Sequence, residues 1–273
     1  MRRAALWLLA TIAVLAVALA VLLALPVREW RTGERFENRL SAIPADAMPS
    51  AAERIWIDSD SACGAGDRVD PDDCLSILYL AFHEGVDVVG LSTVFGNAPL
   101  EVTDRIGREL ARLLAAHGGD RFAVHTGAAR PREDEARPAT NAQRSLSEAL
   151  ADGPLTILAL GPLTNVAAAL RARPDLAGRI ERVVAVMGRR PGHVFHPSEA
   201  SGEGMLFGHG PIFRDLNVAL DTEAVGTVLA HRVPLTLIPY EAARAAELDS
   251  AALDRLAAAG PAHAWVAERA RPW

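Results

Sequence analysis

Short apolar runs alternate with amphipathic segments from Arg54 onward, a pattern typical of strands that alternate with helices. The runs that predict buried strands are 55–57, 86–94, 122–125, 155–160, 183–187 and 235–238. The segments that predict helices are 72–84, 99–116, 144–151, 163–172, 221–231 and 249–270. This alternation predicts an α/β fold with an open, doubly wound, mostly parallel sheet. Two long irregular stretches, 126–144 and 188–214, have lengths typical of binding loops.

A longer apolar run lies near the N-terminus. Ala4 to Val27 contains no charged residue, and Arg2 and Arg3 precede it. Its length suits a transmembrane helix of about 20 residues and exceeds the usual signal-peptide core of about 7 to 15. We expect residues 1–27 to be an uncleaved single-pass signal anchor in the cell membrane; a cleaved signal peptide is the alternative. Residues 28–53 would form a linker, and 54–273 an α/β domain on the periplasmic or extracytoplasmic side.

Composition narrows the classes of function. The 273 residues carry a net charge of -6, without the basic block of a nucleic-acid-binding surface. Every basic residue apart from histidine is arginine, because the chain contains no lysine. The two cysteines, Cys63 and Cys74, form no C-x-x-C motif. They are either two thiols or, outside the cytosol, a disulfide that closes a loop.

The densest group of acidic residues follows the first predicted strand. Asp58 and Asp60 end that strand, and Asp70, Asp72 and Asp73 lie at the start of the next helix. Ligands of open parallel sheets bind at the carboxyl ends of the strands. Single aspartates at such positions are ordinary helix caps. Several carboxylates so close together repel unless a cation offsets them, which favours a site for a hard cation such as Ca²⁺.

Other strand ends carry polar or glycine-containing signatures in a definite order. Gly96-Asn97 follows the second strand, and Gly-Pro-Leu-Thr-Asn begins at Gly161 after the fourth. Met187-Gly188 follows the fifth strand, and Asp215-Leu216-Asn217 comes later. Each signature alone is a common turn or helix start. Taken in this order with the acidic cluster, over residues 54–239, they resemble the inosine-uridine-type nucleoside hydrolases.

The resemblance implies an enzyme that hydrolyses the N-glycosidic bond of ribonucleosides, giving free base and ribose, with a bound calcium ion. Asp60 matches a calcium ligand that is also the proposed general base toward water. Asp73 matches a second calcium ligand, and Leu160 lies where the family supplies a backbone carbonyl to the metal. The substrate-binding residues that it implies are Asp72, Asn97, Met187, Asp215 and Asn217.

The sequence departs from the family at its central loop and in its later part. A loop from Ser61 to Pro71 replaces the family's tight Pro-Gly turn, so that Asp58, Asp67 and Asp70 are alternative ligands. Asp215 stands where the family has a longer glutamate. Nothing after Pro239 matches the family's His-Asp pair, so either the chain is a fragment or its site is incomplete.

Three histidines, His193, His196 and His209, follow the fifth predicted strand after the Met187-Gly188-Arg189 segment that replaces the family's Met-Gly-Gly. Histidine is suited to proton donation near neutral pH, so these residues are candidates for the missing acid. The alternative is that all three are solvent-facing residues of a surface loop.

Two other functions are compatible with parts of this pattern. A haloacid-dehalogenase-like phosphatase also begins with a strand and Asp-x-Asp, with Asp58 as nucleophile, but that chemistry normally uses a lysine, which this chain lacks. A membrane-tethered nucleoside or ribose binder without catalysis would explain the missing His-Asp pair. Either way the expected partners are a small nucleoside and the membrane, with no nucleic acid. The sequence leaves base preference and the oligomeric state open, a homo-oligomer included.

Overall fold

The computed structural model describes residues 7, 10–19, 52–66, 69–131, 138–188, 215–243 and 248–273. Residues 10–19 are helical, and the Thr11 hydroxyl donates to the Trp7 carbonyl at 2.9 Å. Across the described residues, no helix has the length and apolar character that crossing a bilayer requires. The rest of the predicted anchor and most of the predicted linker lie outside the described residues.

A six-stranded parallel sheet forms the centre of the α/β domain, as predicted. Its strands lie in the order β3-β2-β1-β4-β5-β6, and every neighbouring pair is parallel. The strand bounds are β1 Glu53–Ser59, β2 Val86–Thr93, β3 Val124–Thr126, β4 Leu155–Ala159, β5 Ile180–Ala185 and β6 Leu235–Leu237. Each predicted apolar run therefore forms part of a strand or lies next to one.

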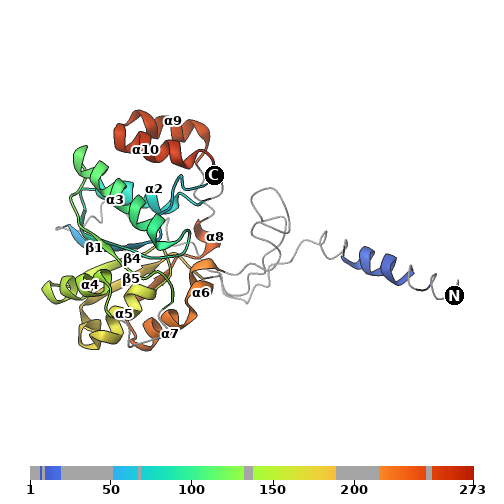
Figure 1. The fold of residues 1–273 in the computed structure, drawn as a ribbon, viewed down its shortest axis with the longest axis horizontal. Coiled ribbons are helices and arrows are strands. Elements are labelled where there is room, and N and C mark those ends of the chain that lie inside the picture. Colours follow the sequence, from blue (N-terminus) through green and yellow to red (C-terminus); the bar gives the residue numbers. More distant parts are fainter. Residues whose placement is uncertain are drawn as a thin grey trace. The chain divides into compact units, whose positions relative to one another are not determined.

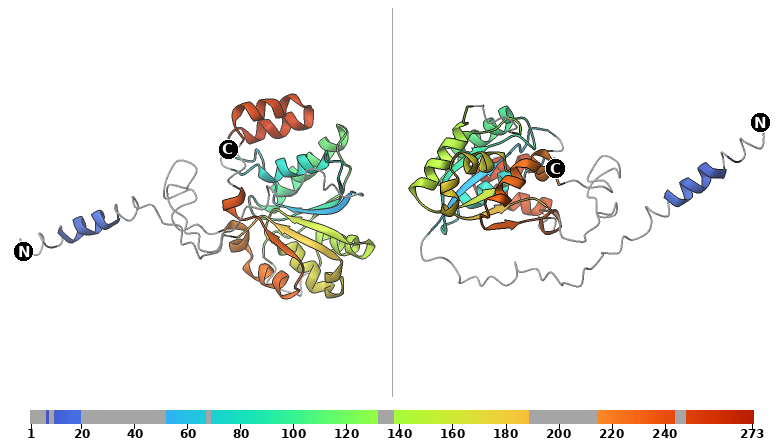
Figure 2. Two further views of the ribbon diagram at one scale, coloured as in Figure 1. Left: turned by 180° about the vertical axis from the view of Figure 1, so that it is seen from behind. Right: turned by 90° about the horizontal axis from the view of Figure 1, so that it is seen from below.

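Helices cover both faces of this sheet (Figures 1 and 2). Trp56 and Ile57 point to opposite faces because neighbouring side chains of a strand alternate. Trp56 packs with α4, α5 and α7, whereas Ile57 packs with α2, α3 and α10. The helix bounds are α2 Asp72–Ala81, α3 Leu100–Ala116, α4 Asn141–Asp152, α5 Thr164–Ala172, α6 Leu216–Leu220, α7 Thr222–Ala230, α8 Tyr240–Ala243, α9 Ser250–Ala258 and α10 Pro261–Ala270, with a 3-10 helix at Pro174–Arg179. The doubly wound arrangement is therefore confirmed.

One predicted helix is wrong in its extent. The segment 249–270 forms two helices, α9 and α10, rather than one. Gly260 has a φ of 148°, which only glycine adopts readily, and Pro261 follows at the first turn of α10. The two helices pack against each other, and α10 also packs against α2 and α3. The short helices α6 and α8 and the 3-10 helix were not predicted, because they are too short to show a clear period.

Candidate active and metal site

The candidate site lies where the order of the strands reverses. β1 is followed in the chain by its neighbour β2 on one side, and β4 by its neighbour β5 on the other. In open α/β sheets the crevice for ligands forms at this switch point, outside the carboxyl ends of the strands. Asp60 lies just after β1 and Leu160 just after β4. Leu160 N–H donates to the Asp58 carbonyl at 2.8 Å, which joins the two strand ends.

The Asp60 carboxylate is held between the loops after β2 and β4. Its Oδ2 accepts a hydrogen bond from the Asn97 backbone N–H at 2.8 Å. A Cβ on Gly96 would lie 1.9 Å from the same oxygen, and one on Gly161 would lie 3.0 Å from Asp60 Cγ. Glycine at 96 and 161 therefore gives this carboxylate the room to lie against two backbones. Asp60 is 4% exposed, so its position leaves little contact with water.

Asp73, in the first turn of α2, faces the end of β1. Ser59 Oγ donates to Asp73 Oδ2 at 2.5 Å, and Ser61 N–H donates to Ser59 Oγ at 3.0 Å. Asp60 and Asp73 lie close enough that each affects the pKa of the other. The structure thus brings the two predicted carboxylate ligands together across the switch point.

Both carboxyl groups carry strongly shifted pKa values. Burial, followed by repulsion from Asp72, raises the pKa of Asp60 to about 7 against the hydrogen bond from Asn97. Burial, followed by repulsion from Asp60, raises the pKa of Asp73 well above its usual range. Among the described residues, no arginine forms an ion pair with either carboxylate. Neither carboxyl group therefore has a positively charged partner among the described residues, and the raised pKa values favour protonation where no cation is bound.

This donor set fits a hard divalent cation. Calcium binds about six to eight oxygens from carboxylates, carbonyls and water. Asp60 and Asp73 would supply carboxylates and Leu160 a carbonyl, leaving the other positions to water and to substrate hydroxyls. Within the described ranges, no three His, Cys, Asp or Glu side chains are grouped so that they could hold a metal by themselves. The candidate site therefore depends on backbone and non-protein oxygens as well.

Asn217 lies beside the Leu160 carbonyl. Its Nδ2 donates to the Leu160 carbonyl at 2.7 Å and to the Val186 carbonyl at 2.9 Å. A carbonyl has two lone pairs, so the Leu160 oxygen retains one acceptor direction. The side chain of Asp215 accepts from Val218 N–H at 2.8 Å and so caps α6, which carries Asn217. Met187, 1% exposed, is buried at the end of β5.

The remaining aspartates differ in what they contact. Asp58 is fully buried, and its Oδ1 accepts from Ser92 Oγ at 2.5 Å and from Asn165 Nδ2 at 2.8 Å. These bonds tie one oxygen of Asp58 to β2 and α5. Its Oδ2 has no hydrogen-bond partner, and burial raises its pKa to about 6.

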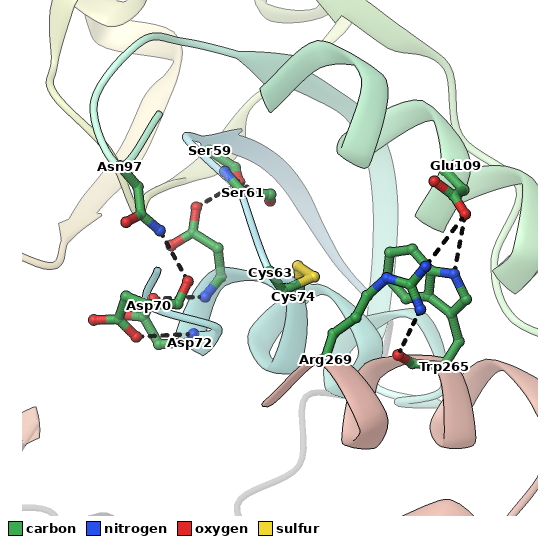
Figure 3. Close-up of a disulfide and its surroundings, with 11 residues drawn as sticks. Ser59, Ser61, Cys63, Asp70, Asp72, Cys74, Asn97, Glu109, Trp265 and Arg269 are labelled. Atoms are coloured by element: carbon green, nitrogen blue, oxygen red, sulfur yellow. Dashed lines mark hydrogen bonds and ion pairs between the residues drawn. A yellow bond between two sulfur atoms is a disulfide. The ribbon is translucent and has the colours of Figure 1, made fainter. Parts of the chain in front are cut away.

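Asp70 and Asp72 lie at the outer side of the site (Figure 3). The Asn97 side chain donates to the Asp70 carbonyl at 2.8 Å, and Asp72 N–H donates to Asp70 Oδ1 at 3.2 Å. Asp72 is exposed, and its Oδ1 accepts from Asp73 N–H at 2.8 Å. Both Asn97 and Asp72, predicted to bind substrate, are thus near Asp60 and Asp73.

Several predicted residues lie outside the described residues: Asp67, Arg189, His193, His196 and His209. Sequence reasoning missed the support that Ser59 gives to Asp73 and the contact of Gly96 and Gly161 with Asp60. The glycines could have been found as turn residues after two strands, but Ser59 carries no signal that distinguishes it from other strand serines.

The two cysteines form a disulfide, one of the two alternatives that the sequence left open. The bond links Cys63, in the loop after β1, to Cys74 in α2. Both residues are fully buried. The loop that carries the acidic cluster is therefore closed by a covalent bond at its base (Figure 3).

Comparison with known proteins gives consistent similarities. The probable uridine nucleosidase 2 of Oryza sativa subsp. japonica is 27% identical over 176 residues, covering 56% of this chain and 50% of that protein. The pyrimidine-specific ribonucleoside hydrolase RihB of Escherichia coli O1:K1 / APEC is 27% identical over 188 residues, covering 61% and 55%. The chain thus spans about half the length of the curated relatives that it matches.

Among solved structures, the purine-preferring ribonucleoside hydrolase from Gardnerella vaginalis superposes with a TM-score of 0.62. It shares 16% identity, and the match covers 81% of this chain and 71% of that one, which shows a common fold. The sequence model of the inosine-uridine preferring nucleoside hydrolase family matches residues 55–271. Because this match covers most of the chain, the chain belongs to the inosine-uridine preferring nucleoside hydrolase family.

Proposed function

We propose that this protein hydrolyses the N-glycosidic bond of ribonucleosides to free base and ribose, with water as nucleophile and Ca²⁺ as cofactor. The observation that carries the proposal is the meeting of Asp60 and Asp73, two buried carboxylates, at the switch point of the sheet. Membership of the family supports the reaction class. The names of the relatives, uridine nucleosidase and pyrimidine-specific ribonucleoside hydrolase, make uridine and cytidine the first substrates to test.

Asp60, Asp73 and the Leu160 carbonyl would hold the calcium ion. When bound, the ion supplies positive charge that makes a water molecule more acidic and draws in the ribose hydroxyls. Asp60 then acts as general base and takes the proton of the attacking water. The Asn97 backbone N–H keeps one Asp60 oxygen in place, and the other oxygen would accept the proton.

The ribose would lie between the ends of β1, β4 and β5. Asp72 is exposed at the start of α2, where it can accept a hydrogen bond from a ribose hydroxyl. Asn217 and Met187 would contact the sugar from the side of β5, and Asp215 would support Asn217 through the cap of α6. As the base departs, positive charge develops on the ribose, and the surrounding carboxylates stabilise it.

The reaction is tested by measuring free base released from a nucleoside panel with calcium and with a chelator. We expect base release from at least one ribonucleoside, and loss of this activity when calcium is removed. Base release that persists after complete metal removal would contradict the calcium-dependent mechanism. No release from any nucleoside, at any calcium concentration, would contradict the hydrolase function.

A second candidate is a protein that binds a nucleoside or ribose without cleaving it. Binding of calcium and ribose by Asp60, Asp73 and the Leu160 carbonyl would suffice for this function. Calorimetry with a nucleoside in the presence of calcium distinguishes the two. Tight binding without release of base supports the binder, and turnover excludes it.

We also propose that the domain functions outside the cytoplasm and is attached to the membrane by residues 1–27. The Cys63–Cys74 disulfide supports this location, since disulfides persist mainly in oxidising compartments. The apolar run from Ala4 to Val27 supports the anchor. Fractionation of cells that express the full chain should recover it in the membrane fraction. Its domain should be accessible to external protease once the outer membrane or cell wall has been permeabilised. Recovery in the cytosolic fraction would contradict this location.

A further inference from the structure

The Cys63–Cys74 disulfide joins the two segments that carry the candidate calcium ligands. Cys63 comes three residues after Asp60, and Cys74 comes directly after Asp73. The bond holds the two cysteine Cα atoms 6.3 Å apart across a sequence separation of 11. It therefore adds a second covalent connection, besides the chain itself, between the end of β1 and the first turn of α2.

The loop that this disulfide closes has few other described contacts that fix its shape. Gly64 and Gly66 are exposed, and a single turn bond runs from Ala65 N–H to the Ala62 carbonyl. Just before α2, the loop is held by a hydrogen bond from the Asn97 side chain to the Asp70 carbonyl. Helix α2 then begins without a capping hydrogen bond from the side chain of its N-cap residue. Without the disulfide, these contacts and the hydrogen bond from Ser59 to Asp73 would be what holds the start of α2 to β1 among the described residues.

The disulfide is also part of the packing beneath the site. Both cysteines belong to an apolar cluster that contains Leu160, whose carbonyl is the third candidate ligand, and residues of α10. On the outer side, the Gly64 backbone packs so closely on Arg269 that a Cβ would lie 2.5 Å from its Cγ.

Arg269 itself is held firmly on α10 (Figure 3). Its guanidinium carbon lies 3.8 Å from the centre of the Trp265 ring, and Arg269 pairs with Glu109 of α3 at 3.7 Å. Trp265 Nε1–H donates to Glu109 at 3.1 Å. Helices α3 and α10 thus form a fixed support on which the disulfide-closed loop rests.

We propose that the Cys63–Cys74 disulfide is a positioning element of the calcium site: it fixes Asp73 opposite Asp60, so the protein with this bond intact binds calcium more tightly than the protein without it. This inference rests on the proposed function, because calcium is the ion that the hydrolase would use. The cysteines touch neither the ion nor the substrate, and they act only through the two aspartates. The bond therefore sets the affinity of the site rather than its chemistry.

The test compares calcium binding by the oxidised protein and by the Cys63→Ala/Cys74→Ala variant, using isothermal titration calorimetry. The mass of the unreduced wild type first establishes that the disulfide is formed. A matched control is Leu146→Ala, a fully buried residue of α4 on the other face of the sheet, which destabilises the fold without touching the acidic loop. Circular dichroism selects a temperature at which all three proteins are folded.

We expect the calcium Kd of the double variant to rise at least tenfold, while that of Leu146→Ala stays within a factor of two of the wild type. Base release by the double variant should recover at saturating calcium, because the aspartates themselves are unchanged. If the double alanine variant does not fold, Cys63→Ala/Cys74→Val, which fills more of the volume, is measured in the same way.

Three results would overturn the inference. Equal calcium affinity in the wild type and the double variant would do so, as would an equal loss of affinity in Leu146→Ala. Failure of both cysteine variants to fold, even with calcium, would assign the bond to folding rather than to the site. Absence of calcium binding by the wild type would instead remove the calcium-dependent function itself, so the two failures are distinguishable.

Discussion

The two loops that flank the switch point, β1–α2 and β4–α5, each connect the end of a strand to the next helix, but different contacts hold them in place. In the β4–α5 loop, residues 160–163 are buried and lead directly into α5. Thr164 Oγ1 donates to Asp221 Oδ2 at 2.6 Å. Asn165 donates to Asp58 and to the Thr93 carbonyl, and it accepts from Ala128 N–H. Both polar side chains at the start of α5, Thr164 and Asn165, therefore have partners within the protein.

The β1–α2 loop is longer, more exposed and more highly charged. It buries Asp60 and Asp73 next to each other without a positive side chain in contact among the described residues, and the Cys63–Cys74 disulfide closes it. Two carboxylates buried next to each other lower the stability of the fold, since burying like charges costs free energy. The comparison indicates that the β4–α5 loop contributes a backbone carbonyl, that of Leu160, whereas the β1–α2 loop supplies the carboxylates of the proposed cation site.

The largest effect is expected for Asp60→Asn. The amide keeps the shape of the side chain but cannot take a proton from water, so base release should fall about 10³-fold. Asp70→Asn, in the same loop, is the control and should change the rate less than tenfold. The metal-free Asp60→Asn protein should be at least as stable as the wild type in urea, because one repelling charge has been removed. A normal rate in Asp60→Asn would contradict the assigned role.

Removal of the disulfide is expected to lower the free energy of unfolding by about 3 kcal/mol, since the bond closes a loop of roughly a dozen residues. Urea unfolding of Cys63→Ala/Cys74→Ala against the oxidised wild type measures this difference. A change below about 1 kcal/mol would mean that the β1–α2 loop is held by other contacts and is less distinct from β4–α5 than the structure indicates.

The sequence predicted the scaffold better than the details of the site. The six strands could be predicted because each is a short apolar run between turn residues, and their parallel order follows from the alternation with helices. The pairing of Asp60 with Asp73 follows from the positions of strand ends. The role of Asp58 could not be predicted, because whether it faces the site or Asn165 depends on packing between elements that are distant in sequence.

The same limit applies to the cysteines and to the last helices. Two cysteines 11 residues apart are compatible with thiols or with a disulfide until the geometry of the loop is known. The break between α9 and α10 lies at Gly260-Pro261, a clear turn signal, which the apolar periodicity of 249–270 obscured.

The stability of the metal-free protein should depend on pH in the direction opposite to ordinary acid unfolding. The pKa of Asp58, about 6, and that of Asp60, about 7, lie above the unfolded value near 3.8. The folded state therefore binds more protons between about pH 4 and pH 7, so its stability falls as pH rises through this window.

We expect Asp58 to make the metal-free wild type lose about 1.4 kcal/mol more stability between pH 5 and pH 8 than the Asp58→Asn variant loses. Urea unfolding of the two metal-free proteins at the two pH values measures the difference. An identical pH dependence in the wild type and in Asp58→Asn would show that Asp58 titrates as it does in the unfolded chain.

The smallest effect is expected in the β4–α5 loop. Thr164→Val keeps the shape of the side chain and removes its hydrogen bond to Asp221, which still caps α7 through Ala224 N–H. The free energy of unfolding should fall by about 1 kcal/mol, and calcium affinity should not change. Loss of calcium binding in this variant would mean that the Thr164 side chain, and not only the nearby Leu160 carbonyl, contributes to the metal site.

The most direct test of the account is a calcium titration of the wild type and of Asp73→Asn by calorimetry. We predict one calcium ion per chain in the wild type and at least a hundredfold weaker binding in the variant, with base release following the occupancy of the site. Calcium binding that is absent from the wild type, or unchanged by Asp73→Asn, would contradict a metal site built on Asp60 and Asp73.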